Sequence, residues 1–244
     1  MRADSRTPGA ADWNAERRLE EAEHMDAVGV DAARLVRALK FIRRINALLG
    51  YTRATIGHLD RLTRALPTTR PITILDVATG SADVPQAILR WAKRRGRSVS
   101  ITGLDLHAQT LDFARTQIDG RVPLVRGDAL ALPFGDGSFD VVMTSMFLHH
   151  LPTPLAVSVM REMDRVASRV VIVADLLRKR RAYQWISLFT CLSDPMVRHD
   201  ARVSVRQSFT LDEAAALVRD AGLDYLRVHR EMAHRFVVSG SKSR

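Results

Sequence analysis

Hydrophobic positions repeat at two different periods along the chain. Before Pro67 they recur every three or four residues, as at Leu35, Leu39 and Ile42, which predicts amphipathic helices. After Pro71, short apolar runs of strand length alternate with helical segments. The strand-like runs are 72–77, 99–105, 122–126, 139–145 and 170–175, and the helical segments between them are 83–95, 108–118 and 153–167. This alternation predicts an α/β fold with a parallel sheet covered by helices on both faces.

The change of period divides the chain into four regions. Residues 1–70 form an N-terminal helical cap, whose first helix is expected over Glu16–Glu23, and residues 71–175 form the core. Residues 176–208 interrupt the sheet pattern, and residues 209–244 complete the core with one helix and two strands. Thr210 and Glu213 have the spacing of a capping box, which predicts the start of that helix. We expect the cap and the insertion to form a lid over the core.

Composition narrows the class of protein. No window holds 18 uninterrupted apolar residues, so no membrane span is expected. The polar start of the chain lacks the apolar stretch of a secretory signal, and the single cysteine, Cys191, can form neither an internal disulfide nor a zinc cluster. We therefore expect a soluble, cytoplasmic protein without a metal site.

The positive charge admits two interpretations. There are 37 Lys and Arg residues against 27 Asp and Glu, a net charge of +10, which is compatible with nucleic-acid binding. The basic residues are spread along the whole chain, however, and aromatic residues make up only 6%. Few stacking platforms for single-stranded nucleic acid are therefore available, and a solvated arginine-rich surface is the simpler interpretation.

Acidic residues follow three successive predicted strands. Asp76, Asp105 and Asp128 stand at or just beyond these strand ends, where ligands bind in open α/β sheets. A dinucleotide fingerprint would require glycine at positions 78, 80 and 83, and only Gly80 is present. A carboxylate at Asp83 would also repel a pyrophosphate. A nucleoside that carries positive charge, such as S-adenosylmethionine, suits these residues better, with Asp105 on the ribose and Asp128 on the adenine amino group.

The motifs in this order resemble a known family. LDVATGSAD, GLD, GDALALPFGDGSFDVVMTSMFLHHL and EMDRV are similar to class I S-adenosylmethionine-dependent methyltransferases, and most similar to those of quinone biosynthesis and of small phenolic or polyketide substrates. The resemblance implies a Rossmann-like, doubly wound sheet of seven mostly parallel strands, the last antiparallel. It also implies cofactor contacts from Asp76, Ala78, Thr79, Gly80, Asp105, Leu106, Asp128, Ala129 and Ser145. The class usually has glycine where this chain has Ala78 and Ala82, which narrows the first loop.

Two adjacent histidines follow the fourth predicted strand. His149 and His150 are candidates for the base that takes a proton from an acceptor hydroxyl, because imidazole titrates near neutrality. The resemblance slightly favours His150. The alternative is that one of them caps or packs against the next helix.

The insertion offers candidate substrate contacts. Tyr183, Trp185, Arg198 and His199 combine apolar rings with polar groups, as expected of a pocket for a ring-shaped acceptor, although the aromatic residues could equally pack on the core. The sequence thus predicts an enzyme, a methyltransferase of secondary metabolism that methylates a small phenolic or quinol hydroxyl and releases S-adenosylhomocysteine. C-methylation of a quinone-like ring, RNA methylation and a catalytically silent cofactor-binding scaffold remain as alternatives.

Overall fold

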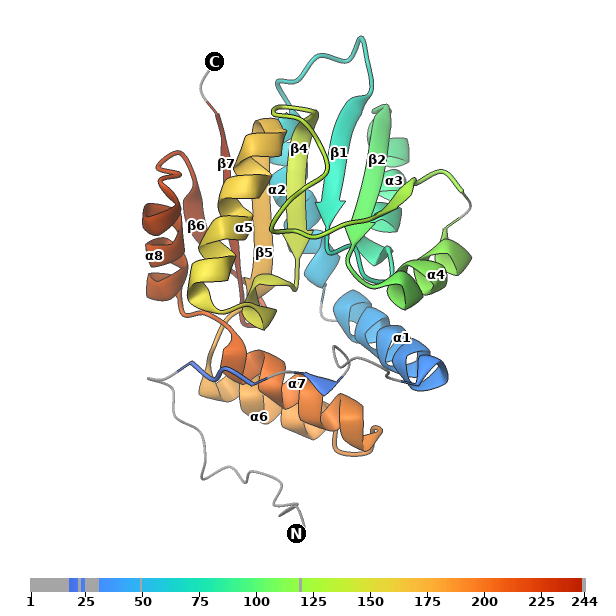
Figure 1. Ribbon diagram of the computed structural model, residues 1–244, viewed down its shortest axis with the longest axis vertical. Coiled ribbons are helices and arrows are strands. Elements are labelled where there is room, and N and C mark those ends of the chain that lie inside the picture. Colours follow the sequence, from blue (N-terminus) through green and yellow to red (C-terminus); the bar gives the residue numbers. More distant parts are fainter. Residues whose placement is uncertain (1–17, 22, 25–30, 49, 119, 243–244) are drawn as a thin grey trace.

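A seven-stranded sheet runs through the centre of the computed structural model (Figure 1). The structure describes residues 18–21, 23–24, 31–48, 50–118 and 120–242. The strands are β1 Ile72–Val77, β2 Val99–Asp105, β3 Leu124–Arg126, β4 Phe139–Ser145, β5 Ala167–Leu176, β6 Arg227–Glu231 and β7 Arg235–Ser241. Their order is β3-β2-β1-β4-β5-β7-β6, and β7 alone runs antiparallel to its neighbours β5 and β6. The predicted Rossmann-like sheet is confirmed.

Helices cover both faces of this sheet and lie beyond the carboxyl ends of its strands (Figure 1). They are α1 Ala32–Leu48, α2 Tyr51–Thr63, α3 Asp83–Arg95, α4 Ala108–Gln117, the 3-10 helix η3 Leu148–His150, α5 Thr153–Val166, α6 Arg180–Phe189, α7 Pro195–Gln207 and α8 Leu211–Ala221. The capping box predicted for α8 is present, since the Thr210 side chain accepts from the Glu213 amide and the Glu213 carboxylate accepts from the Thr210 amide. α3, α4 and α5 match the predicted segments to within one residue.

The core consists of two apolar layers. Alternate side chains of β1 point to opposite faces, so that Leu75 and Val77 pack with α5 and α8 while Ile72 and Ile74 pack with α2 and α3. All four side chains are almost completely buried. Burial of each such side chain stabilises the fold by about 1.5–3 kcal/mol. These positions therefore have to be apolar, and the strands stand out in the sequence as apolar runs.

Two predicted elements differ in the structure. The helix expected over Glu16–Glu23 is wrong for the part that is described, because the chain at 18–21 and 23 is not helical and instead lies along α7, where the Leu19 amide donates to the Arg206 carbonyl at 3.1 Å. The strand expected over 122–126 begins only at Leu124, since Pro123 has no N–H to donate to the sheet.

The strand order reverses between β1 and β4. In this architecture the crevice beyond the carboxyl ends of the strands at this point is the expected ligand site. α1, α6 and α7 lie beyond that edge of the sheet, at the bottom of Figure 1. α1 and the insertion therefore face the place where a ligand would bind, whereas α2, also part of the predicted cap, packs on a face of the sheet (Figure 1).

Candidate active site

A cavity of about 500 Å³ opens beyond the carboxyl ends of β1 and β4. One end is formed by the loop after β1, from Asp76 to Asp83, and by Ser145 at the end of β4. The other end is lined by His149 and His150. Apolar side chains of α1 and α6 complete the walls, namely Leu39, Phe41, Ile42, Ile45, Trp185, Ile186 and Phe189, and Asn46 of α1 interacts with Asp83. The cavity thus has a polar end and a largely apolar end.

The loop after β1 has an unusual backbone. Ala78, Gly80 and Ala82 have φ angles of 55°, 53° and 57°. For the two alanines this left-handed conformation costs about 1–2 kcal/mol each, because their Cβ atoms crowd the backbone. The loop is held to β2 by the Thr79 amide, which donates to the Leu104 carbonyl at 2.9 Å. Ala78 and Ala82, which replace the glycines usual in the resembling family, therefore adopt the left-handed backbone conformation that glycine favours.

Two carboxylates give the polar end its electrostatic character. Burial raises the pKa of Asp76 to about 7, although the Thr79 hydroxyl, which donates to it at 2.6 Å, acts in the opposite direction. Burial also raises the pKa of Asp83. A positively charged ligand would favour the ionised form of both groups. The Ser145 hydroxyl oxygen is buried at the same end, close to the Tyr51 hydroxyl.

The predicted nucleoside contacts continue from this end along the sheet edge. Asp105 is buried at the end of β2, and it accepts hydrogen bonds from the amides of Gly80 and His107, both at 3.0 Å. The half-exposed Leu106, the exposed Asp128 and the buried Ala129 stand after β2 and β3 and do not line the cavity itself. These residues follow β2 and β3, the strands that lie beside β1 in the sheet, an order that suits a ligand that is cationic at one end and a nucleoside at the other.

The apolar end contains a buried histidine–aspartate pair. His149 Nδ1 lies 2.6 Å from the Asp175 carboxylate, which also accepts a hydrogen bond from the His149 amide at 3.0 Å. His149 is 1% exposed and Asp175 is 0% exposed. An acceptor at Nδ1 keeps the ring proton on that nitrogen, so Nε2 of the neutral ring can accept a proton.

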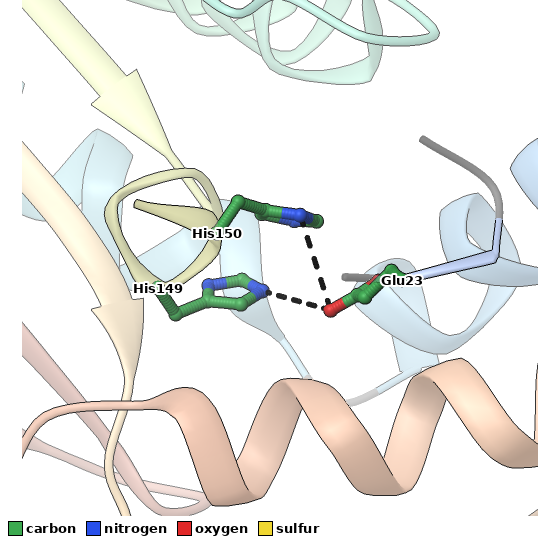
Figure 2. Close-up of side chains that lie close together, drawn as sticks. All are labelled: Glu23, His149 and His150. Atoms are coloured by element: carbon green, nitrogen blue, oxygen red, sulfur yellow. Dashed lines mark ion pairs between the residues drawn. The ribbon is translucent and has the colours of Figure 1, made fainter. Parts of the chain in front are cut away.

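Figure 2 shows that His149 and His150 point toward Glu23, which comes from the segment before α1. The Glu23 carboxylate lies 3.8 Å from His149 Nε2 and 3.9 Å from His150 Nδ1. It accepts a hydrogen bond from the Ser204 hydroxyl on α7 at 2.5 Å. The three ligand atoms lie within 4.8 Å of one another, so this group could also hold a metal ion.

Two further residues hold this end in place. The Arg18 guanidinium donates to the carbonyls of His149 and Leu151 at 2.8 and 2.7 Å, and so ties the N-terminal segment to η3. Tyr51 of α2 lines the cavity and donates to the Ala174 carbonyl at 2.6 Å. Burial, and then the charge of Asp175, raise the pKa of Tyr51 well above its usual value, so that it stays protonated.

Some predicted substrate residues lie elsewhere. Trp185 lines the cavity, but Tyr183, Arg198 and His199 do not. Tyr183 packs against Val205, the Arg198 guanidinium lies near the Cys191 carbonyl, and the His199 ring stacks on His24. Their positions on α6 and α7 follow from helix packing, which the sequence pattern did not resolve.

Two residues of the cavity's apolar end were missed in the sequence. Asp175 ends the fifth predicted strand, and this position at a strand end was the available signal. Glu23 lies in a charged segment that resembles a solvated helix, and no local pattern marks it. The contacts of that segment with α7 and with η3 bring Glu23 to the cavity.

Comparison with known proteins identifies the core. Residues 74–169 match a family model described as a methyltransferase domain. These residues form a methyltransferase domain. The domain includes the loop after β1 and Asp105, the residues with the geometry suited to a cationic nucleoside.

The methyltransferase domain is similar to curated enzymes over part of their length. The chain is 36% identical over 97 residues to a demethylmenaquinone methyltransferase of Lactobacillus johnsonii, covering 38% of each chain. It is 34% identical over 111 residues to the enzyme of the same name from Bacillus subtilis, covering 44% of this chain and 46% of the relative. The matches therefore span less than half of these relatives.

The fold extends the similarity to most of the chain. A SAM dependent methyltransferase from Aquifex aeolicus superposes with a TM-score of 0.57 at 16% identity, covering 86% of this chain and 98% of that chain. Human N-acetylserotonin methyltransferase, solved in complex with SAM, superposes with a TM-score of 0.62 at 12% identity, covering 88% of this chain and 57% of that chain. No helix in the described part of the chain is long and apolar enough to cross a membrane.

Proposed function

We propose that the protein transfers a methyl group from S-adenosylmethionine to the hydroxyl of a small, hydrophobic phenol or quinol. The observation that carries this proposal is the buried His149–Asp175 pair, whose histidine lines the same cavity as the carboxylates of the cofactor end. The cofactor supplies an electrophilic methyl group on a sulfonium when it is bound.

The cofactor end would hold the ligand by charge and hydrogen bonds. Asp76 and Asp83 would accept from the ammonium of the methionine moiety, and Asp105 from the ribose hydroxyls. The Ser145 hydroxyl offers one further polar contact. Leu106, Asp128 and Ala129 would surround the adenine at the open edge.

His149 would act as the base. Its Nε2 would take the proton of the acceptor hydroxyl, whose oxygen would receive the methyl group that the sulfonium of the bound cofactor supplies. Asp175 holds the ring by Nδ1 and stabilises the imidazolium that results. The Glu23 carboxylate lies 3.8 Å from Nε2, so an acceptor hydroxyl would have to approach the two atoms from the side to contact both. Orientation of the acceptor by the apolar walls accounts for the remainder of the catalysis.

Methylation of a ring carbon is the alternative supported by the names of the curated relatives. Removing the proton from a quinol hydroxyl also makes the neighbouring ring carbon nucleophilic, so the same base serves both reactions. Which atom faces the sulfonium decides the product. Nuclear magnetic resonance of the methylated product distinguishes a methoxy group from a ring methyl group.

The experiment supplies methyl-labelled S-adenosylmethionine with a panel of phenols and naphthoquinols, and separately with an extract of the source cells that is split into organic, nucleic-acid and protein fractions. Label in the organic fraction as a methoxy group is expected. Label confined to RNA would contradict the proposal and would assign the basic surface to RNA binding, while binding of the cofactor without any transfer would indicate a silent scaffold.

A further inference from the structure

Helix α6 carries an exposed apolar stripe, and only part of this stripe lines the cavity of the proposed active site. Trp185, Leu188 and Phe189 are 55%, 63% and 45% exposed, and Leu192, in the turn after α6, is 97% exposed. These four exposed hydrophobic side chains fall within eight consecutive residues, 185–192. Residues 185, 188 and 189 share one face of the helix, because their spacing is three and four. Such a contiguous patch marks an interaction surface.

The same stripe borders the mouth of the cavity. Trp185 and Phe189 line the cavity and are nevertheless about half exposed, so they stand at its rim. Their rings are stacked, with centroids 5.8 Å apart. A molecule that enters the cavity on this side passes along the apolar stripe.

The charge next to the stripe is positive. Between Asp175 and Asp194 the chain has four basic residues and no acidic one. Arg178 is buried against Glu213, at 2.6 Å, whereas Arg180 and Arg181 are exposed at the start of α6 and Lys179 is partly exposed just before it. α6 therefore combines an aromatic and aliphatic face with cations at one end, as helices that lie in a membrane interface do.

We propose that α6 docks the protein on the surface of an anionic lipid bilayer. The side chains of 185, 188, 189 and 192 would enter the boundary between headgroups and acyl chains, and the cations of 179–181 would lie against the headgroup phosphates. The mouth of the cavity would then face the lipid, so that an apolar acceptor reaches His149 without crossing water. Docking does not require methyl transfer and is tested without it.

The charges argue against a second copy of the chain on this stripe. In a symmetric dimer through α6 the same surface is used by both copies, and residues 176–193 hold no acidic side chain to face either basic cluster. Anionic headgroups instead complement them. A bilayer is therefore the occupant that these side chains favour.

The test is flotation of the full chain with vesicles of phosphatidylcholine alone and of phosphatidylcholine containing one-third phosphatidylglycerol. We expect binding to the anionic vesicles that weakens as salt is added. The double variant Leu188→Gln/Leu192→Gln should lower the partition constant by at least about ten-fold, since two apolar side chains lose their burial. Neither residue lines the cavity, so affinity for S-adenosylhomocysteine should not change.

The charge contribution has a matched control. Arg180→Gln/Arg181→Gln should weaken binding to anionic vesicles by about 25-fold at low salt, or about five-fold for each charge. Lys93→Gln/Arg94→Gln removes two exposed charges at the end of α3, at the opposite edge of the sheet, and should leave binding unchanged. Leu155→Gln, at an exposed position on α5, is the control for the apolar substitutions.

Three outcomes would overturn the proposal. They are a failure of the wild-type chain to bind either kind of vesicle, an equal loss of binding in the control variants, and a dimer in sedimentation velocity that Leu188→Gln/Leu192→Gln dissociates. The last outcome would assign the stripe to a second copy. Equal thermal denaturation midpoints for all variants would establish that each of them is folded.

Discussion

The two ends of the cavity are built in different ways. The cofactor end comes mainly from one short stretch, Asp76 to Asp83, which a hydrogen bond from the Gly80 amide joins to Asp105. The acceptor end assembles Glu23, His149 and Asp175 from three distant parts of the chain. A site made by one loop at a strand end can be recognised in a sequence, whereas a site assembled by packing requires the structure.

The difference also implies a separation of roles. If the carboxylates at one end bind the cofactor and the histidine at the other end moves a proton, substitutions at the two ends should affect different quantities. The following predictions test that separation, in order of decreasing expected effect.

The largest effect is expected for His149→Ala. Loss of a general base lowers the rate of methyl transfer by about 10²–10⁴-fold, while the affinity for S-adenosylhomocysteine should stay within about three-fold. Steady-state kinetics and calorimetric titration measure the two quantities. Asp175→Asn should lower the rate too, because an amide no longer fixes the proton on Nδ1.

His150→Ala is the matched control for this prediction. The His150 side chain faces Glu23 but lies next to His149 rather than against Asp175, so its removal should cost far less activity. If His150→Ala abolished turnover and His149→Ala did not, the assignment of the base would be reversed, as the sequence resemblance had slightly favoured.

The second-largest effect is expected on the pH dependence of cofactor affinity, through Asp76. Because the pKa of this buried carboxyl is raised to about 7, we expect the affinity for S-adenosylhomocysteine to increase as the pH rises through 7, as the ionised form becomes available to the ligand ammonium. Asp76→Asn should weaken binding by about ten-fold or more near pH 8 and should remove most of this pH dependence. Unchanged pH dependence in the variant would show that another group is responsible.

The same shift predicts the pH dependence of stability. The native carboxyl keeps its proton to about pH 7, whereas the unfolded one releases it near its ordinary pKa of 3.8. The native state therefore binds more protons in this window, and the contribution of Asp76 destabilises the unliganded protein as the pH rises through it. Thermal denaturation of the wild type and Asp76→Asn at several pH values measures the difference.

A smaller effect is expected for Glu23→Gln. The amide keeps the size of the side chain and removes its charge near His149 Nε2, so we expect KM for the acceptor to rise by a few-fold with little change in cofactor affinity. Treatment with a chelator should leave the wild-type rate unchanged if His149 acts as a base. Loss of activity that a divalent metal restores would instead assign Glu23, His149 and His150 to a metal site.

The smallest effect concerns the strained loop. Ala82→Gly should change the free energy of unfolding by no more than about 1 kcal/mol, because relief of the left-handed conformation is offset by the greater freedom of glycine in the unfolded chain. Activity should be retained. Chemical denaturation gives the energy, and a large loss of cofactor affinity would show that the Ala82 methyl group contacts the ligand.

Much of the fold could be predicted because its signals are local. The alternation around Ile72–Val77 and the capping box at Thr210 depend only on neighbouring residues and on burial. Tyr183 and His199 were assigned to the substrate because their residue types fit. Whether a side chain on α6 or α7 faces the cavity depends on how the two helices pack, and the sequence pattern does not record that packing.

The most direct test of the central claim is calorimetric titration of S-adenosylhomocysteine into the wild type, Asp76→Asn and His149→Ala near pH 8. The separation of roles predicts that Asp76→Asn binds about ten-fold more weakly or worse, while His149→Ala binds within about three-fold of the wild type. Equal weakening in both variants, or weakening in His149→Ala alone, would contradict the assignment of cofactor and acceptor to opposite ends of the cavity.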